Sequence, residues 1–594
     1  MKHYQSMCLN RRLLHFGKLL NVLKKSFPVI SVLLFALFAT ISYAQESSEP
    51  LAQLKENILN VSLKGVVYNQ SLQEKNGSCI VSIKVLNTDK QKEEEYEFNF
   101  SDLNEYKVNL NATKRSLKIS IETKGGKKII RVYENGNVKG YANKFDFYAG
   151  DVENGKLLVE EIQKQIKPCE DKQKDLSMIL GGPPDINRAS EFLKTNIKKV
   201  SVNGNVMDQQ FSVDESFKSF CKFDITNQKV EKNINFNFNA SDINSSTIDF
   251  NTKNEFVIVS GQTKGNKKII EVFENGEKDN YVNKFLFYVE DIEVARKVKN
   301  VFEWYVKESE KLISLELNKL DKINSLVELN EFFKARFKDV TVSEKSFKQS
   351  FLYETSKPFL ATFNVNNVNK GGSESRILNL VDLNEYGVSF DTKGNEVRIE
   401  MQTNGGMNLV KNTTEGEIGK YTDKSTIWAS SIEDARVLVE TLKKMISKAK
   451  EIYKPYFIEG VEKPTKTQCL TYLKGAFTEV VIGDNAYKLK LEEDESDNCK
   501  LVYEEHDVTK DKTSHYTFNM LDVNGYKINF NSKGQEALVY LEIKGEKKFI
   551  EISEQGTKKG YNYKINLKAQ DIEKARLITE AFKKLSEHCS EANK

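Results

Sequence analysis

The chain has 594 residues, more than one hydrophobic core usually serves, so several domains are expected. Hydrophobic residues make up 39% of it and aromatic residues 10%, a composition typical of folded domains that excludes a disordered chain. Only eight residues are proline, so long linkers between the domains are not expected.

The first 44 residues have the pattern of a secretory signal peptide. They hold six of the 89 Lys and Arg and none of the 85 Asp and Glu, followed by an apolar run from Phe27 to Ser42 and a small residue at Ala44. This run is shorter than the roughly 20 residues of a spanning helix, which favours cleavage before Gln45 over an uncleaved anchor. We therefore expect an exported protein, periplasmic or secreted, with no transmembrane segment after cleavage.

Removal of this segment changes the charge balance. The remaining 83 Lys and Arg face 85 Asp and Glu, which gives a net charge of −2. A chain with this balance has no basic surplus with which to attract phosphates, so nucleic acid is not expected as a partner.

Four tandem repeats follow the signal peptide. The segment "DLNEYKVNLN" begins at Asp102, "DLNEYGVSFD" begins at Asp382, and the aspartate recurs every 140 residues, at Asp102, Asp242, Asp382 and Asp522. About 125 structured residues per copy is the size of a domain and too long for a solenoid unit. We predict repeat 1 at 45–170, repeat 2 at 186–311, repeat 3 at 325–450 and repeat 4 at 464–594.

The periodicity within a repeat predicts an α+β fold. Each copy begins with a short helix, continues with about seven antiparallel strands in a bent sandwich or partial barrel, and closes with an amphipathic helix. The closing helices begin at good N-caps: Asp151, Asp291, Ser431 and Asp571. A recurrent glycine is expected to provide a positive φ in a tight hairpin, at Gly125, Gly265, Gly405 and Gly545.

This order of elements, with a "DIExAR" start to the last helix, resembles the pleckstrin-homology-like (PH-like) fold. The resemblance implies seven strands in a strongly bent sandwich, with the last helix closing one open corner. It covers each copy from its first strand onward and lies in element order, not in a diagnostic motif. The additional N-terminal helix departs from that pattern and leaves a cystatin-like or lipocalin-like fold as an alternative.

Two sets of repeated polar residues are candidate sites. The aspartates and the asparagines two residues later are interpreted as turn-forming residues that bind nearby backbone amides, rather than as ligand or metal residues. The second set consists of Tyr141, Tyr281, Tyr421, Tyr561, Lys144, Lys284, Lys424 and Lys564. We favour tyrosines packed at the sandwich rim and solvated lysines over four sites for an acidic or aromatic ligand.

The sequence contains no known catalytic motif. GxSxG, HExxH, P-loop and Rossmann patterns are missing from all 594 residues. Three histidines follow the signal peptide, His506, His515 and His588, and all lie in repeat 4 near cysteines, but no spacing matches a pair of zinc ligands. We expect no catalytic residues, metal or cofactor, while enzymatic activity stays open.

Two classes of function remain. The first is an exported, non-enzymatic multidomain binding or scaffold protein for an unknown protein or small ligand, whose similar domains multiply weak contacts. The second is a carrier of an apolar small molecule or lipid inside each sandwich; a cell-surface hydrolase is a weaker third. A carrier needs a cavity of several hundred Å³, on the order of 300 Å³ or more, within a repeat. The predicted inward aromatics Phe98, Phe145 and Phe147 favour filled cores and hence the scaffold.

The cysteine spacing predicts two disulfides. Cys79 and Cys499 begin matching strands, and Cys169 and Cys589 each lie 18 residues after the cap of the closing helix. We predict Cys79–Cys169 and Cys499–Cys589, with Cys221 as a lone strand cysteine in repeat 2. Alternatives are a Cys469–Cys589 bond and six free, buried thiols.

The segments between repeats also differ. The link from repeat 1 to repeat 2 contains "GGPP" at 181–184, which must break a helix. The link from repeat 2 to repeat 3 has neither Gly nor Pro, so a continuous or barely interrupted helix is expected there.

Overall fold

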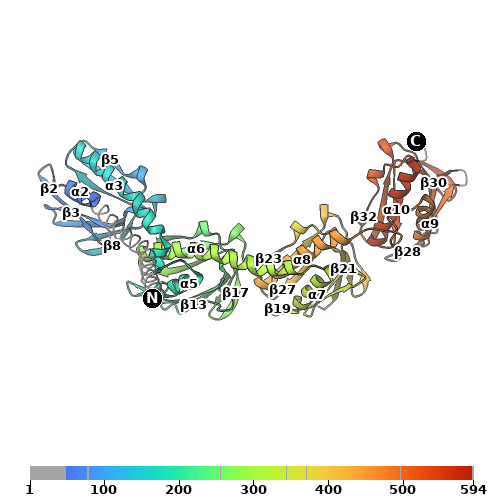
Figure 1. The fold of residues 1–594 in the computed structure, drawn as a ribbon, viewed down its shortest axis with the longest axis horizontal. Coiled ribbons are helices and arrows are strands. Elements are labelled where there is room, and N and C mark those ends of the chain that lie inside the picture. Colours follow the sequence, from blue (N-terminus) through green and yellow to red (C-terminus); the bar gives the residue numbers. More distant parts are fainter. Residues whose placement is uncertain are drawn as a thin grey trace, which may run out of the picture. The chain divides into compact units, whose positions relative to one another are not determined.

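The computed structural model describes residues 49–75, 79–253, 256–342, 344–369, 371–494 and 497–591; the predicted signal peptide lies outside them. It combines helices and antiparallel sheets in repeated units (Figure 1). The opening helices are α2 (Glu49–Asn57), α5 (Ile186–Asn196), α7 (Leu326–Arg336) and α9 (Lys466–Ala476). The closing helices are α3 (Val152–Lys174), α6 (Ile292–Leu317), α8 (Ile432–Ile452) and α10 (Ile572–Glu591).

Nine strands occur in the described part of each repeat. Those of repeat 1 are β1 (Val61–Leu63), β2 (Val66–Glu74), β3 (Ile80–Asn87), β4 (Lys92–Asn99), β5 (Asn109–Ala112), β6 (Leu117–Glu122), β7 (Ile130–Glu134), β8 (Asn137–Ala142) and β9 (Lys144–Ala149). Those of repeat 2 are β10 (Val200–Val202), β11 (Asn205–Val213), β12 (Phe220–Asn227), β13 (Lys232–Asn239), β14 (Asp249–Lys253), β15 (Phe256–Gln262), β16 (Ile270–Glu274), β17 (Glu277–Val282) and β18 (Lys284–Val289). Those of repeat 3 are β19 (Val340–Val342), β20 (Lys345–Glu354), β21 (Lys357–Asn367), β22 (Ser373–Asn379), β23 (Ser389–Lys393), β24 (Glu396–Gln402), β25 (Lys411–Thr414), β26 (Glu417–Ile418) and β27 (Lys424–Ala429). Those of repeat 4 are β28 (Glu479–Ile482), β29 (Asn485–Asp494), β30 (Asp497–Asp507), β31 (Lys512–Asn519), β32 (Asn529–Lys533), β33 (Glu536–Glu542), β34 (Ile550–Glu554), β35 (Thr557–Asn562) and β36 (Lys564–Ala569).

The strands form a six-stranded and a three-stranded antiparallel sheet in every repeat. In repeat 1 the orders are β1-β2-β3-β4-β7-β8 and β5-β6-β9, and the same two orders recur in the other repeats. The predicted number of about seven strands is therefore too low. The additional strands carry little hydrophobic alternation, since β1 has three residues and β8 is exposed along half its length.

Short 3-10 helices connect the two sheets. They are η1 (Phe100–Asp102), η2 (Glu105–Lys107) and η3 (Lys124–Gly126) in repeat 1, η4 (Ala240–Asp242), η5 (Ser245–Thr247) and η6 (Lys264–Asn266) in repeat 2, η8 (Leu380–Asp382), η9 (Glu385–Gly387) and η10 (Asn404–Gly406) in repeat 3, and η11 (Gly525–Lys527) and η12 (Lys544–Glu546) in repeat 4. Gly125 has φ of 64°, which confirms the predicted positive φ. It lies in η3, however, where the chain passes from β6 of one sheet to β7 of the other, and not in a tight hairpin.

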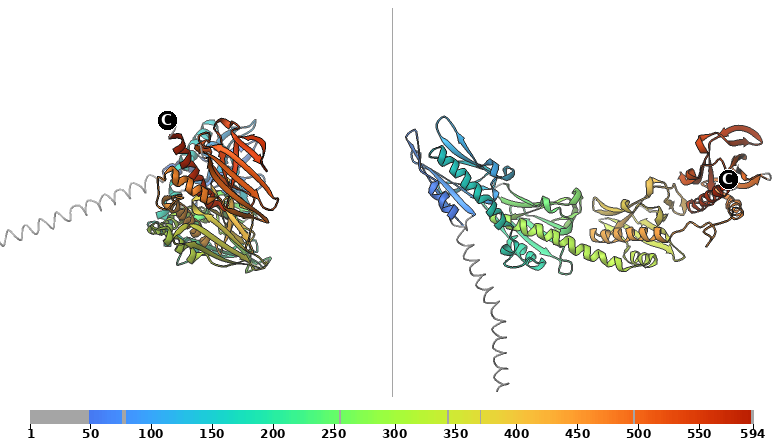
Figure 2. Two further views of the ribbon diagram at one scale, coloured as in Figure 1. Left: turned by 90° about the vertical axis from the view of Figure 1, so that its right-hand side faces the viewer. Right: turned by 45° about the horizontal axis from the view of Figure 1, so that its top comes forward.

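In repeats 1, 3 and 4 the closing helix contacts all three strands of the three-stranded sheet of its own repeat. Figure 2 shows long helices running alongside the sheets. The predicted caps are confirmed: the side chain of Asp151 accepts from the amide of Asn154 at 2.7 Å, and Asp571 accepts from Lys574 at 2.8 Å. A Cβ at Gly155 would lie 2.6 Å from Leu110 Cδ1, so this helix lies very close to the sheet.

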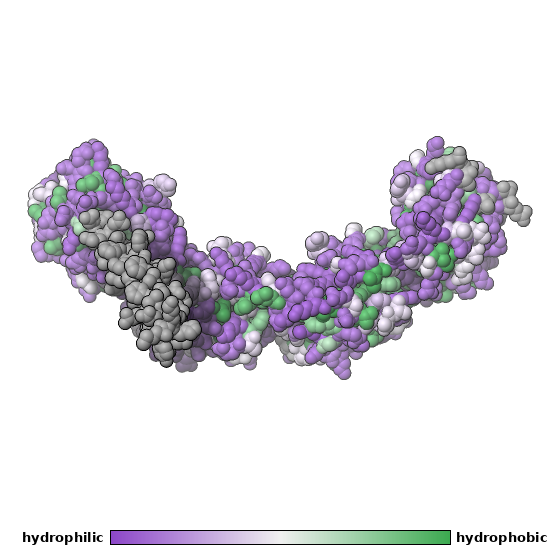
Figure 3. Space-filling view, in the orientation of Figure 1, coloured by the Kyte–Doolittle hydropathy of each residue, from purple (hydrophilic) through white to green (hydrophobic). Residues whose placement is uncertain are grey.

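Aromatic side chains fill the interior of the sandwiches. Phe98, Phe145 and Phe147 are all at most 5% exposed, and the rings of Phe98 and Phe145 lie 5.3 Å apart. In repeat 2, Phe223 stacks on Phe287 with ring centroids 4.8 Å apart. The face of the molecule in Figure 3 is correspondingly mostly hydrophilic. The cores thus agree with the filled interiors expected from the sequence.

Both predicted disulfides are present. Cys79 and Cys169 have a Cα separation of 5.5 Å, and Cys499 and Cys589 one of 5.9 Å. Cys221 is not the equivalent of Cys79, because the backbone position that Cys79 occupies belongs to Ser219 in repeat 2. The cysteine instead lies two residues further along the strand and is a fully buried, free core residue.

By its internal contacts the chain forms two units. The first contains repeat 1 and most of repeat 2, and the second contains the β16–β17 hairpin with repeats 3 and 4. Helix α6 continues into η7 (Asn318–Lys322), and only residues 323–325 separate it from α7, which agrees with the predicted barely interrupted helix. The link after repeat 1 instead holds α4 (Leu176–Leu180) and then breaks at Gly181. In the described residues, no helix is both long enough and apolar enough to span a bilayer.

Candidate functional site at the junctions between repeats

Asparagines, not aspartates, shape the turn that follows β4. The side chain of Asn99 accepts from the amide of Ser101 at 3.0 Å, and Asn104 accepts from Tyr106 at 3.1 Å. These contacts fix η1 and η2 and recur at the equivalent asparagines of the later repeats. The predicted role is thus confirmed for the asparagine of "DLN" and wrong for Asp102, whose carboxylate points to the next repeat.

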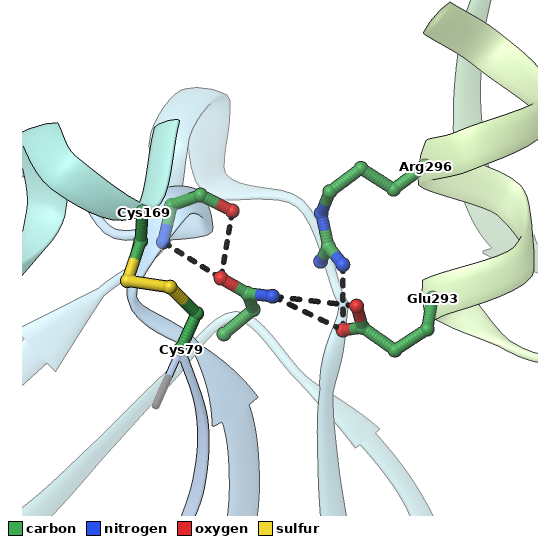
Figure 4. The surroundings of a disulfide bond; sticks show 6 residues. Cys79, Cys169, Glu293 and Arg296 are labelled. Carbon is green, nitrogen blue, oxygen red and sulfur yellow. Dashed lines mark hydrogen bonds and ion pairs between the residues drawn. A yellow bond between two sulfur atoms is a disulfide. The ribbon is translucent and has the colours of Figure 1, made fainter. Parts of the chain in front are cut away.

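A buried ion pair joins repeat 1 to repeat 2. Arg296, in the first turns of α6, donates from Nε to Asp102 Oδ1 at 3.3 Å and from Nη2 to Oδ2. The two side chains are 6% and 10% exposed. Glu293 also contacts Arg296, and it accepts from Asn99 Nδ2 at 3.3 Å (Figure 4). We call this contact between repeats 1 and 2 the first junction.

The same four residue types join repeat 3 to repeat 4, at what we call the third junction. Arg576 of α10 donates to Asp382 and to Glu573, the latter at 3.3 Å, and Asn379 donates to Glu573 at 3.1 Å. The side chains of Arg576 and Asp382 are 9% and 8% exposed. Partners in both junctions are 194 residues apart, and Asp242 and Arg436 have the same spacing.

At the third junction one arginine forms ion pairs with two carboxylates. Burial opposes the charge of Arg576, but the attraction of Asp382 and Glu573 prevails and raises its pKa. Burial raises the pKa of Asp382 and of Glu573, against the opposing attraction of the arginine. The carboxylates therefore depend on this cation, and its removal would leave one buried and one half-buried acid uncompensated.

A repeated hydroxyl adds a backbone contact at each junction. Thr252 Oγ1 donates to the carbonyl of Lys128 at 2.7 Å, and Ser532 Oγ donates to that of Asn408 at 2.5 Å. The second junction, between the β16–β17 hairpin and repeat 3, has the same bond from Thr392 to Lys268. A lysine also lies over the aromatic ring two residues before the hydroxyl at two junctions: Lys127 is 5.3 Å from the ring of Phe250, and Lys267 is 5.6 Å from that of Phe390.

Two of the repeated tyrosines lie at these junctions, whereas the repeated lysines are exposed. Tyr281 and Tyr421 are 5% and 6% exposed and pack into the hydrophobic core of the repeat that follows. Tyr421 also donates its amide to the carbonyl of Gly534 at 2.9 Å. Tyr141 is half-buried, Tyr561 is exposed, and all four lysines, Lys144, Lys284, Lys424 and Lys564, are exposed. The tyrosines of repeats 2 and 3 are therefore buried by the repeat that follows, while the lysines of all four repeats are exposed to solvent.

A cleft of about 890 Å³ lies along the first junction. Charged residues from both repeats line it, among them Glu97, Arg131 and Lys297, together with the Cys79 end of the disulfide. Figure 4 shows Arg296 and Glu293 extending from α6 toward this disulfide. The cleft lies between two domains rather than inside a sandwich, and its walls combine these charged residues with apolar ones such as Ile129 and Met178.

A smaller pocket of about 290 Å³ lies in repeat 3. Trp428 stacks on Phe347 with centroids 4.3 Å apart, and its Nε1 donates to Glu396 at 3.0 Å. Burial would raise the pKa of Glu396, but hydrogen bonds from Lys345, Trp428 and Arg398 lower it to about 2. The carboxylate is thus occupied by internal partners.

Histidines and thiols are dispersed in repeat 4. His506 bonds Thr513 at 2.9 Å, His515 pairs with Glu504 at 3.2 Å, and His588 bonds the carbonyl of Pro464 at 2.7 Å. No group of three potential metal ligands occurs among the described residues. Burial raises the pKa of the Cys469 thiol to about 11, which keeps it protonated and weakly nucleophilic.

Compared with family models, curated proteins and solved structures, the chain matches none of them. Sequence reasoning missed the arginine of "DIExAR" as the partner of the "DLN" aspartate. A signal was available: Arg296, Arg436 and Arg576 occur only in repeats that have a predecessor, whereas repeat 1 has Lys156 at that position.

Proposed function

We propose that the protein is an exported, non-enzymatic scaffold that holds tandem binding domains in a defined succession. The observation that carries this proposal is the junction itself: a buried Asp–Arg pair, with a supporting Glu and Asn, used at the first and third junctions. Such pairs fix geometry and register more than they add stability. A chain of independent domains on flexible links would have no use for them.

Two further features support this proposal. The sandwich cores are filled by stacked aromatic rings, which leaves little room for the apolar cargo of a carrier. Two disulfides suit an oxidising compartment outside the cytoplasm, in agreement with the signal-peptide pattern. Each repeat is proposed as a PH-like variant, in which two antiparallel sheets and a closing helix are extended by two strands and an opening helix.

Mass spectrometry of the protein purified from its source under native conditions tests this function. A scaffold retains protein partners and shows the mass of the chain without small-molecule adducts. An apolar molecule bound in stoichiometric amount would instead establish the carrier. A chain with one partner-binding repeat and three silent ones would contradict a scaffold of equivalent domains.

A further inference from the structure

Repeat 4 has a face that the next repeat covers elsewhere in the chain. In repeat 3 this exit face includes Asp382, Leu409 and Tyr421, which are 7%, 3% and 6% exposed because repeat 4 packs on them. The same positions of repeat 4 hold Asp522, Phe549 and Tyr561. The residue types are kept, yet Phe549 is 51% and Tyr561 52% exposed, and Asp522 is half-buried.

The carboxylate of Asp522 differs from its equivalents in its surroundings. Asp102 and Asp382 each receive an arginine from the following repeat. Among residues 497–591 and the other described segments, no cation forms an ion pair with Asp522. Repeat 4 thus presents an acceptor face with its acidic and aromatic residues in place, and Phe549 and Tyr561 on it are exposed in the described structure.

Repeat 1 has the complementary entry face. At the third junction the entering residues are Phe530, Ile572, Glu573 and Arg576, and repeat 1 has Leu110, Val152, Glu153 and Lys156 at those positions. Each replacement keeps the charge or the apolar character. Val152 is 46% exposed where Ile572 is 5% exposed, and the Lys156–Glu153 pair is open to solvent at 63% and 82% exposure.

We propose that these two faces bind each other between molecules, so that repeat 4 of one chain takes repeat 1 of a second copy. Asp522 pairs with Lys156, and Phe549 and Tyr561 cover Val152 and Leu110. The complementarity of charge and the continuity with the three internal junctions identify the second copy as the occupant. The contact is heterologous, so its products are rings or open fibres.

The contact between chains is weaker than the internal junctions. Lysine is a point charge and does not reproduce the two-pronged contact of arginine. Ala112 replaces the threonine or serine whose hydroxyl bonds a backbone carbonyl at the internal junctions. The internal contacts also have an effective concentration on the order of millimolar from their short links. Association is therefore expected only at high protein concentration.

Sedimentation velocity of the chain from Gln45 onward tests this proposal. The weight-average mass of the unaltered protein should rise with concentration up to about 1 mM, the effective concentration of the internal junctions. Asp522→Arg and Lys156→Asp should each weaken this association about 100-fold or more, because each places like charges at the contact. Asp89→Arg, in the exposed β3–β4 turn of repeat 1, is the matched control and should leave it unchanged.

A mixture of the two variants provides the sharper test. Asp522→Arg retains the unaltered entry face and Lys156→Asp the unaltered exit face, so each alone is monomeric. In an equimolar mixture the unaltered faces meet, and the arginine introduced at position 522 meets the aspartate introduced at position 156, so both contacts pair opposite charges and association is restored. Circular dichroism and the thermal transition of each variant check that it is folded. A chain that is monomeric at about 1 mM, association that survives Asp522→Arg, or a mixture that does not associate would overturn the proposal.

Discussion

Repeats 1 and 4 have a disulfide at a position where repeats 2 and 3 have other residue pairs. Where repeats 1 and 4 have Cys79–Cys169 and Cys499–Cys589, repeat 2 has Ser219 and Ser309, and repeat 3 has Phe359 and Ala449. Both serines are buried, and their hydroxyls have no hydrogen-bond partner in the part of the chain that the structure describes. The Phe359 ring instead packs on Tyr453 at 4.7 Å.

This difference follows the position of the repeats in the chain. Repeat 2 contacts a neighbour at both the first and the second junction, whereas repeats 1 and 4 each have one junction within the chain. A junction buries apolar surface that an end repeat leaves open. The two disulfides thus occur in the repeats for which the described residues show one junction each.

The largest effect is expected from removing a disulfide in an end repeat. Cys499→Ser with Cys589→Ser releases a closed loop of 90 residues, for which the chain-entropy model gives about 4–5 kcal/mol as an upper figure. Hydrogen exchange in β30 and α10 should accelerate strongly, while repeat 3 keeps its protection. The control is Cys221→Ser with Cys469→Ser, which replaces two cysteines that form no disulfide. Equal effects from the two double variants would contradict the prediction.

Breaking the third junction should lower the free energy of unfolding slightly less than removing the disulfide does. Arg576→Ala leaves the buried carboxylate of Asp382 and the half-buried one of Glu573 without a cation, which lowers the free energy of unfolding by about 3–4 kcal/mol. Hydrogen exchange of η8 and of the α10 N-terminus measures this locally, since a chain of several domains has no single unfolding transition. Lys156→Ala changes the same position in repeat 1, where the side chain is 63% exposed, and should cost no more than about 0.5 kcal/mol in a monomeric sample. A similar loss of stability in both variants would show that burial of the ion pair does not determine its contribution.

The sequence predicts what lies within a repeat better than what lies between repeats. Period-2 alternation, the cap at Asp151 and the disulfide spacing depend on local patterns or on comparison of copies, and the structure confirms them. The order β4-β7 could not be predicted, because it depends on how η1 to η3 lead the chain between sheets. The pairing of Asp102 with Arg296 lies across 194 residues and leaves no local periodicity, so its signal is found only by comparing copies: the arginine occurs in the repeats that have a predecessor.

Introducing a disulfide into repeat 2 should raise the stability of that repeat by a smaller amount. Ser219→Cys with Ser309→Cys places cysteines where repeats 1 and 4 have theirs, and we expect a disulfide that adds about 2 kcal/mol. Ser309→Ala alone should add about 1 kcal/mol, because it removes a buried hydroxyl that has no partner in the described structure. Thiol titration and the thermal transition with and without reductant measure both effects. Free thiols in the folded double variant would show that the two positions are not equivalent to those of repeat 1.

The smallest effect is expected for the loss of stability of repeat 3, which has no cysteine, at low pH. The pKa of Glu396 is about 2 against an ordinary value of 4.5, because Lys345, Trp428 and Arg398 all bind its ionised form. A depressed folded-state pKa means that this contribution is complete above pH 4.5 and is lost as the pH falls from 4.5 toward 2. Because Lys345 is half exposed, we expect this ionised carboxylate to contribute about 1–2 kcal/mol to stability rather than the full value of the shift.

In a Trp304→Phe background, Trp428 fluorescence reports repeat 3 alone, and acid should perturb it before β30 of the disulfide-linked repeat 4 loses its exchange protection. Glu396→Gln should flatten the pH dependence in this window while keeping a hydrogen-bond acceptor for Trp428. An unchanged pH profile in that variant would show that another group controls the acid sensitivity of the repeat.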